Sequence, residues 1–484
     1  MNYTRLKLIQ SLLVGLEGGF PSDWDDDKAA KMSEYIAQRR IRASLNAETD
    51  VSLRSSQGEW EFIDFIQQIS ESENISDTVR NIRDQLSGKF REGCAPRIKI
   101  IFFVQEFSLW ASYRTIYDFF NSRDDCDVAL VYAYSKGRLP ELGKQENIKM
   151  FEGAGYHVVD MADFDFYSEE PDIVFYQKPY FEGNGIPAKY YIEEIAKHVK
   201  YTVFISYCLD VQGGDRLYKF FYGMPMFYRA WKVVAYSNHY YEMLKRYSYC
   251  DGENLIRFGH PKFDALSEIM NNDSLKNDCW EKVINNRRTV MWNSHFSVGE
   301  NVGVGTFFEN YKTMFGYFEK NQDVVLIWRP HPYFWEMVQR DPRMDEGDFD
   351  SLLLKLNKMD NVIIDKSGDY RTAFYYADAL VSDAATFLVE FGMSGKPVMY
   401  TPKKNGESII NEAYLKNVEI CFSAADLVSF LDEIVSAVDL GGHQPANLIE
   451  EFGVCDGNNG RKIGTYVLDA VKEDIGDYWN KLLF

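Results

Sequence analysis

The sequence predicts an α/β protein with two Rossmann-like lobes that follow an N-terminal helical segment. A chain of 484 residues is too long for one hydrophobic core. Short apolar runs, roughly 25–30 residues apart and separated by helical stretches, suit βαβ units of a parallel sheet. The runs form two series of similar size, divided by a polar helical stretch at 264–288. Two doubly wound lobes follow from this pattern.

The chain divides into four parts. Residues 1–95 carry apolar positions at helical spacing and no strand-like run, which predicts a helical appendage for packing or oligomerisation. Residues 96–264 hold the first series of strands and residues 265–460 the second. Residues 461–484 are expected to form a helix that packs across the lobes. The expected strands are 98–104, 128–131, 157–159, 172–175, 202–205, 233–235, 256–258, 289–292, 324–327, 362–364, 379–381, 397–400 and 418–420.

Composition excludes several classes of protein. Apolar residues make up 46% and charged residues 26%, which excludes disorder of the whole chain. A net charge of −20 argues against nucleic-acid binding and gives no global attraction to anionic lipid. An anionic ligand must therefore be held by local donors, such as Arg, His and helix N-termini.

Several absences point to the cytoplasm. Seven scattered cysteines without a CxxC pair indicate reduced thiols. The first residues lack a signal-peptide core, and no apolar run approaches the ~20 residues of a spanning helix. We expect a cytoplasmic protein, with peripheral attachment to a membrane left open. No Cys/His pair has zinc spacing, so no metal site is predicted.

The first candidate motif is the Arg-Pro-His turn, residues 328–332, which follows the expected strand 324–327. Two prolines stiffen it. Arg329 and His331 could then clamp a phosphate, with Arg329 as a fork-shaped donor. The alternative is that Arg329 pairs with a carboxylate and His331 satisfies backbone groups.

The second motif, residues 381–390, is a strand end that passes into a helix. Free amides at Ala384 and at the two residues after it would form an anion site, with Ser382 or Asp383 as cap. Asp383, Thr386 and Glu390 share one helical face, so Glu390 could accept hydrogen bonds from a ribose. A plain capping arrangement is the alternative.

Two further turns carry histidine. Residues 258–264 (Phe-Gly-His-Pro-Lys-Phe-Asp) form a strand followed by a tight turn, for which a structural role is favoured. His295 follows the strand 289–292 and is a candidate for donor contact or proton transfer. A hydrogen-bonded loop histidine is the competing interpretation.

Together these turns resemble the CDP-glycerol glycerophosphotransferase family of teichoic-acid and capsule synthesis. The similar segments are 259–264, 328–332, 369–374, 377–383 and 395–398, within roughly residues 97–465. The resemblance implies a GT-B fold with the donor on the C-terminal lobe. It places Arg329 and His331 at the donor pyrophosphate. It places Ser382, Asp383 and Thr386 around the phosphates or glycerol, and Glu390 near the cytidine ribose.

The sequence departs from the family pattern at two places. The family has a His-Gly turn after an N-lobe strand, whereas residues 206–210 read Ser-Tyr-Cys-Leu-Asp here. Ala385 stands where a serine is usual. With no histidine in the first lobe, His331 is one candidate for the base, and Asp210 and His295 are the others.

The resemblance implies transfer of glycerol phosphate or a similar polyol phosphate from a CDP-linked donor, with release of CMP. No cofactor is implied. The expected acceptor is a glycan or polyol phosphate, with a lipid-linked form left open, and the N-terminal helices offer a surface for homo-oligomers. Two alternatives stay open. One is a GT-B glycosyltransferase that uses a nucleotide sugar, and the other is a non-catalytic nucleotide-binding paralogue.

Overall fold

The computed structural model describes most of the chain after residue 96. The described residues are 81, 97–133, 141–181, 186–210, 215–269, 273–299, 303–383, 385–403, 410–415, 418–440, 446–453 and 455–483. The appendage expected at 1–95 lies outside the described residues, apart from Asn81, which is helical.

Seven parallel strands form the first sheet, in the order β3-β2-β1-β4-β5-β6-β7. The strands are β1 (Ile98–Val104), β2 (Cys126–Tyr132), β3 (Val158–Asp160), β4 (Ile173–Tyr176), β5 (Tyr201–Phe204), β6 (Lys232–Ala235) and β7 (Leu255–Arg257). The helices around them are η1 (Phe107–Ser112), α5 (Arg114–Asn121), α6 (Glu141–Gly153), α7 (Phe166–Glu169), η2 (Ala188–Tyr190), α8 (Ile192–Ile195), α9 (Asp215–Tyr222), α10 (Pro225–Arg229), α11 (Asn238–Tyr247) and α12 (Lys262–Ile269).

Six parallel strands form the second sheet, in the order β10-β9-β8-β11-β12-β13. They are β8 (Arg288–Asn293), β9 (Val324–Trp328), β10 (Val362–Ile364), β11 (Ala379–Ser382), β12 (Val398–Tyr400) and β13 (Glu419–Ile420). The accompanying helices are η3 (Asp273–Leu275), α13 (Asp278–Ile284), α14 (Phe307–Lys320), α15 (Phe334–Gln339), α16 (Glu346–Leu356), α17 (Arg371–Tyr376), α18 (Ala385–Gly392), α19 (Glu412–Leu415), α20 (Ala424–Ser436), α21 (Ala446–Phe452) and α22 (Asn459–Leu483).

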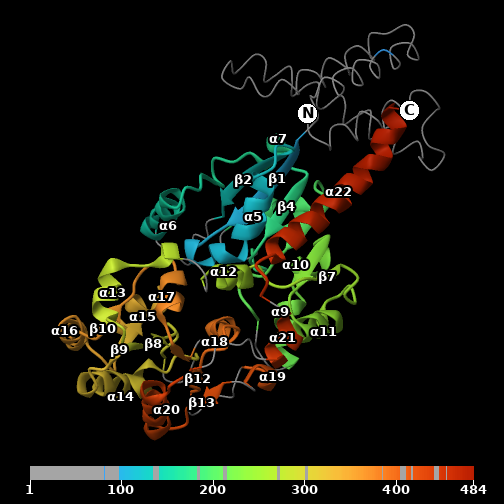
Figure 1. Ribbon diagram of the computed structural model, residues 1–484. Coiled ribbons are helices and arrows are strands. Elements are labelled where there is room, and N and C mark those ends of the chain that lie inside the picture. The colour runs from blue at the N-terminus through green and yellow to red at the C-terminus, as the bar shows by residue number, and fades with distance from the viewer. Residues whose placement is uncertain are drawn as a thin grey trace.

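The predicted fold class is confirmed, since both sheets are parallel and each belongs to its own α/β lobe (Figure 1). Each expected apolar run overlaps a strand, and the central strands β1, β4, β8 and β9 are almost fully buried. This matches parallel sheets that are covered on both faces, whose strands are continuous apolar runs rather than alternating ones.

Three apolar clusters make up the core of the described residues. One covers one face of the first sheet and a second covers one face of the second sheet. The third is continuous from Ile101 in the first lobe to Leu380 in the second. The two lobes therefore share a hydrophobic core.

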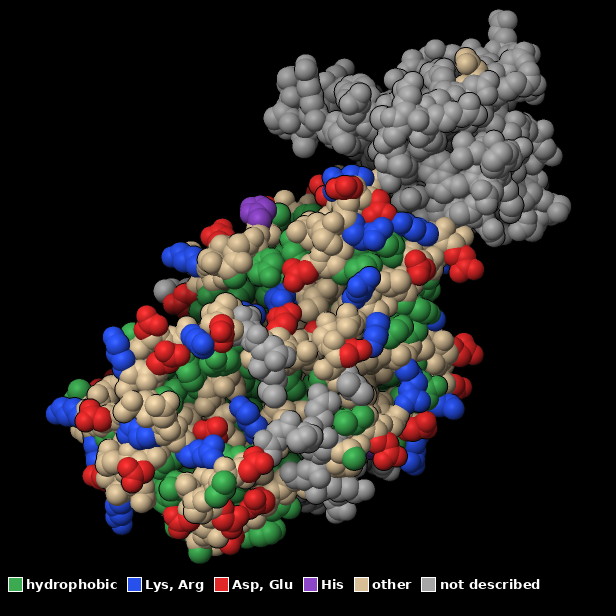
Figure 2. Space-filling view, viewed as in Figure 1, with side chains coloured by type: hydrophobic (Ala, Val, Ile, Leu, Met, Phe, Trp, Pro, Cys, Tyr) green, Lys and Arg blue, Asp and Glu red, His purple; other side chains and the backbone are tan. Residues whose placement is uncertain are grey.

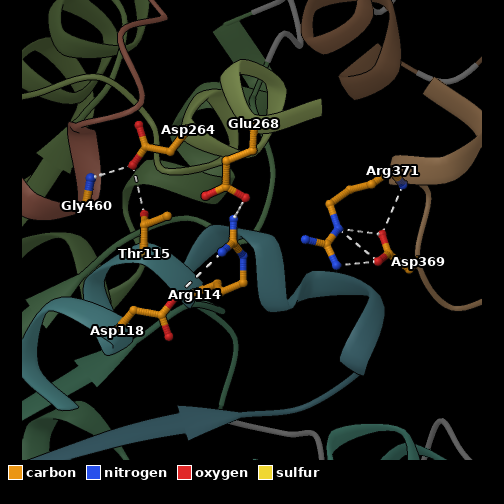
Figure 3. A network of polar contacts seen from close by, with 8 residues as sticks. All are labelled: Arg114, Thr115, Asp118, Asp264, Glu268, Asp369, Arg371 and Gly460. Atoms are coloured by element: carbon orange, nitrogen blue, oxygen red, sulfur yellow. Dashed lines mark hydrogen bonds and ion pairs between the residues drawn. The ribbon is translucent and has the colours of Figure 1, made fainter. Parts of the chain in front are cut away.

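Asp264, at the start of α12, fixes the C-terminal helix to this junction. Its Oδ1 accepts the amide N–H of Asn459 (2.8 Å), and its Oδ2 accepts the amide of Gly460 (2.7 Å) and the Thr115 hydroxyl (2.8 Å). Figure 3 shows this carboxylate between α5 and the start of α22. These bonds satisfy amides at the helix start that have no intrahelical partner. The helix α22 then packs on the first lobe, against α5 and α12.

Ion pairs flank this junction. Arg114 of α5 pairs with Glu268 of α12 and lies 3.5 Å from Asp118. On the second lobe, Arg371 pairs with Asp369 at 2.6 Å, and Figure 3 shows that pair opposite the first. The helix α12 also packs against α17 and α18. The segment 258–264 and the helix after it therefore form the structural link between the lobes.

Charged side chains of both signs are interspersed over the surface shown in Figure 2. No helix among the described residues is long and apolar enough to cross a bilayer. The six cysteines within the described ranges are free thiols.

The substitution Gly460→Ala should destabilise the protein by about 1–3 kcal/mol, the usual effect of overpacking. A Cβ here would press on the Thr115 hydroxyl and lie 2.7 Å from the Thr115 carbonyl carbon. Gly316→Ala in α14 is the matched control, because its Cβ meets nothing within 4 Å. It should stabilise the helix by about 0.8–1.0 kcal/mol. Chemical denaturation measures both, and effects of the same sign would contradict this packing.

Candidate functional site

The carboxyl ends of the two sheets face each other. The order in which the strands are added to each sheet reverses at one point. This point lies between β1 and β4 in the first sheet and between β8 and β11 in the second. Ligands of such sheets bind beyond the strand ends at this switch point. The Tyr333 hydroxyl, after β9, donates to Oε1 of Glu106, after β1 (3.4 Å). The Thr386 hydroxyl in α18 donates to the carbonyl of Leu209, after β5 (3.4 Å). The candidate site lies between these strand ends.

Hydrogen bonds join the ends of β8, β9 and β11. Nδ2 of Asn293 donates to the carbonyl of Arg329 (2.9 Å), and Oδ1 of Asn293 accepts from the Ser382 hydroxyl (3.1 Å). The amide of His331 donates to the carbonyl of Ser294 (2.8 Å). The Arg-Pro-His turn and the strand end before α18 therefore lie beside each other.

The guanidinium group of Arg329 is paired inside the second lobe. It forms an ion pair with Asp365, and the two side chains are 9% and 2% exposed. It also donates to the hydroxyl (3.0 Å) and carbonyl (2.9 Å) of Ser367. This geometry matches the alternative in which Arg329 pairs with a carboxylate. Arg329 therefore anchors the loop after β10.

His331 and His295 form a pair of neighbouring imidazoles with ring centroids 5.6 Å apart. Nδ1 of His331 accepts the amide N–H of Tyr333 (3.2 Å), and Nδ1 of His295 accepts the amide N–H of Ser297 (3.2 Å). An accepting Nδ1 carries no proton, so the proton of each neutral ring is on Nε2.

Burial lowers the pKa of both rings. The pKa of His331 falls to about 3, because the nearby His295, Arg329 and Lys178 add to the effect of burial. The pKa of His295 falls to about 4 through burial. Both rings are neutral at pH 7 and offer Nε2–H as a donor. This arrangement suits donation to a phosphate oxygen better than acceptance of a hydroxyl proton.

Asp383 positions the loop that carries His295. Its Oδ1 accepts the amide of His295 (2.7 Å) and its Oδ2 accepts the amide of Thr306 (2.7 Å). Burial raises the pKa of Asp383 to about 7, although these hydrogen bonds oppose the shift. Asp383 therefore acts on the site by holding His295 in place.

The first turn of α18 meets the loop that carries Asp210. The contact between Thr386 and Leu209 is one residue away from Asp210. Oδ2 of Asp210 accepts from the Tyr222 hydroxyl (2.6 Å), and the Tyr236 hydroxyl accepts the amide of Asp210 (2.5 Å). Ala384 lies outside the described residues. A carboxylate of the first lobe is thus held near the start of α18.

Glu390 is buried in the second turn of α18 and is already paired. Its Oε2 lies 3.3 Å from Nζ of Lys262, and the two side chains are 1% and 6% exposed. Its Oε1 accepts from the Tyr370 hydroxyl. A ribose at Glu390 would have to compete with both partners.

Glu106 and Lys178, which follow β1 and β4, were not predicted as site residues from the sequence. Nζ of Lys178 lies 2.6 Å from Oε2 of Glu106 and 5.6 Å from the centre of the Tyr207 ring. Both strands were predicted, but their adjacency at the switch point was not. The signal that could have found this pair is the charged residue two or three positions after each expected strand, combined with the usual strand order of a doubly wound sheet.

No described group of three or more His, Cys, Asp or Glu side chains is arranged to hold a metal ion. The groups described between the strand ends are hydrogen-bond donors, carboxylates and the ammonium group of Lys178. Such a set can bind an anion and accept a proton.

Comparisons with known proteins bear on the fold. No protein-family model matches the sequence, and no curated protein sequence matches it. A putative UDP-N-acetylglucosamine 2-epimerase from Listeria monocytogenes covers 78% of this chain and 97% of its own, with a TM-score of 0.55 and 10% identity. The S. aureus MnaA structure with UDP covers 79% and 97%, with a TM-score of 0.52 and 14% identity.

The wall teichoic acid polymerase TagF, soaked with CDPG, covers 86% of this chain and 98% of its own. Its TM-score is 0.51 and its identity is 12%. Likenesses at such low identity establish the fold. The protein has a GT-B-like fold with two parallel-sheet α/β lobes.

The substitution Arg329→Ala should reduce stability by about 3–5 kcal/mol, because it leaves the buried Asp365 carboxylate without its partner. The double variant Arg329→Met with Asp365→Leu should recover most of the loss, since neither charge then remains buried. Thermal and urea denaturation measure both. A single variant as stable as the wild type would show that Arg329 is held for ligand binding alone.

The burial of His260 predicts that the stability of the protein depends on pH. It is fully buried, its Nε2 lies 2.8 Å from the Ser206 carbonyl, and its Nδ1 accepts the amide of Lys262 (3.1 Å). Burial lowers its pKa to about 3. The neutral ring therefore stabilises the fold fully above about pH 6.5, the pKa of an unfolded histidine. This stabilisation is lost as the pH falls towards 3.

The variant His260→Gln should accordingly show a shallower loss of unfolding free energy between about pH 6.5 and 4, by up to about 1.4 kcal/mol per pH unit. Denaturant titrations at several pH values measure the slope. The matched control is His157→Gln, at an exposed position of the first lobe. Identical slopes for wild type and His260→Gln would refute the assignment.

Proposed function

We propose that this protein is a transferase that moves glycerol phosphate, or a similar polyol phosphate, from a CDP-linked donor to an acceptor hydroxyl. The observation that carries the proposal is the group formed by His331, His295 and the strand end before α18, where Thr386 contacts the loop that carries Asp210. Support comes from the GT-B-like fold, which is shared with a TagF structure soaked with CDPG and with MnaA holding UDP.

The donor diphosphate would lie against the second lobe. Nε2–H of His331 and of His295 would donate to its oxygens, together with amides of the first turn of α18. Preorganised donors of this kind stabilise the charge that spreads over the equatorial oxygens during phosphoryl transfer. Asp383 and Arg329 would contribute indirectly, by fixing the loops on which the donors stand.

The acceptor hydroxyl would attack the β-phosphorus of the donor. A bond forms between the acceptor oxygen and phosphorus, the bond from phosphorus to the bridging oxygen breaks, and CMP leaves with that oxygen. The hydroxyl proton passes to a carboxylate. Asp210 is the favoured acceptor of this proton, because both histidines hold their protons on Nε2.

The proposed partners follow from this chemistry. The acceptor is a glycan or polyol phosphate, and a lipid-linked form would bring a cytoplasmic enzyme to the membrane surface. The product is a cell-surface polymer or capsule. No cofactor takes part in the proposed step.

A nucleotide-sugar transferase is the second candidate. It is favoured by the fold shared with UDP-N-acetylglucosamine 2-epimerases, one of them bound to UDP-GlcNAc. Here the acceptor attacks carbon, so the leaving group is a nucleoside diphosphate. A third candidate is a non-catalytic protein. It would bind the nucleotide through the same hydrogen-bond donors but would not convert it.

Product analysis tests the proposal. Incubation with CDP-glycerol and a polyol-phosphate acceptor should release CMP in step with acceptor extension, as chromatography with mass detection would measure. The control is Asp210→Asn, which removes the proton acceptor and should lower the rate by about 10²–10⁴-fold. Release of a nucleoside diphosphate from a nucleotide sugar would favour the second candidate. Binding without turnover of any donor would favour the non-catalytic protein.

A further inference from the structure

The donor proposed above carries at least two negative charges, but two cations at the candidate site, Arg329 and Lys262, are already paired. Arg329 is bound to Asp365 in a nearly dry environment. Lys262 is bound to Glu390, and both side chains are buried. The protein has a net charge of −20, so its overall field repels an anion. A cation close to the histidine pair is therefore required from elsewhere.

Lys178 meets this requirement by position. It follows β4, one of the two strands at the switch point of the first sheet. It lies close enough to His331 for its positive charge to contribute to the lowered pKa of that ring. Tyr207 holds this segment in two ways. Its amide donates to the carbonyl of Gln177, the residue before Lys178 (2.9 Å), and its ring lies beside the ammonium group of Lys178. The lysine is thus positioned between the lobes before any ligand arrives.

The partner of Lys178 is Glu106, and the two side chains are 11% and 20% exposed. This is more open than the pairs at Arg329 and Lys262. The carboxylate of Glu106 also accepts from the Tyr333 hydroxyl (3.4 Å), on the turn that carries His331. Glu106 therefore keeps a hydrogen-bond donor from the second lobe if Lys178 is withdrawn from it.

We propose that Lys178 is the cation that binds the diphosphate of a nucleoside-diphosphate donor, and that Glu106 holds it in place until the donor displaces the carboxylate. The inference rests on the proposed function. A diphosphate carries more charge than one carboxylate, so the exchange favours the ligand. Glu106 keeps the flexible lysine side chain ordered beforehand, which reduces the entropy that binding costs.

The two members of the pair should affect binding in opposite directions. Lys178→Gln removes the cation and should weaken CDP binding by about 10- to 100-fold, as expected for a charge-assisted contact. Glu106→Gln removes the competing carboxylate and should tighten CDP binding. Lys178→Arg keeps the charge and should bind CDP within a few-fold of the wild type. The control is Lys189→Gln, at an exposed position of the same lobe.

Isothermal titration calorimetry with CDP tests the inference, and circular dichroism checks that each variant is folded. Equal weakening by Lys178→Gln and Glu106→Gln would overturn it, because the ion pair would then only order the strand ends of the first lobe. If the wild type and Lys178→Gln bound CDP with the same affinity, the role of Lys178 would be overturned and the proposed function would stand. A wild-type protein that binds neither CDP nor UDP would overturn the proposed function as well.

Discussion

A buried ion pair between Lys262 and Glu390 joins the two lobes, and the placement of the candidate site depends on it. Burying two charges costs desolvation energy that their attraction only partly offsets, so such a pair specifies an arrangement more than it stabilises one. The Tyr370 hydroxyl gives Glu390 a second partner. Asp264 lies two residues beyond Lys262. Its carboxylate accepts hydrogen bonds from the start of α22 and from the Thr115 hydroxyl of α5. One short segment thus sets both the lobe contact and the path of the C-terminal helix.

With the lobes held in this way, the strand ends of one sheet meet those of the other. Many polar groups there serve to position their neighbours. Arg329 is held by Asp365, and Asp383 holds the loop of His295. For a ligand we propose the Nε2–H donors of His331 and His295, the first amides of α18, and the more open pair of Lys178 and Glu106. The proposed site combines neutral donors with one exchangeable cation, in a protein whose net charge is strongly negative.

The strands could be predicted from the sequence because buried parallel strands are continuous apolar runs. The expected strands 98–104 and 362–364 coincide with β1 and β10. The partners of the site residues could not be predicted. Asp365 is 36 residues from Arg329 and Glu390 is 128 residues from Lys262, so tertiary packing alone decides these pairs. Glu106 and Lys178 were missed for the same reason, since local sequence does not say that β1 and β4 are neighbours.

A crystal structure with CDP bound would test the central claim most directly. The account predicts that the diphosphate lies between the lobes, within hydrogen-bonding distance of Nε2 of His331 and of the first amides of α18. It further predicts that Nζ of Lys178 turns from Glu106 towards the phosphate oxygens. A nucleotide bound on another surface, or a diphosphate that contacts neither histidine, would contradict it.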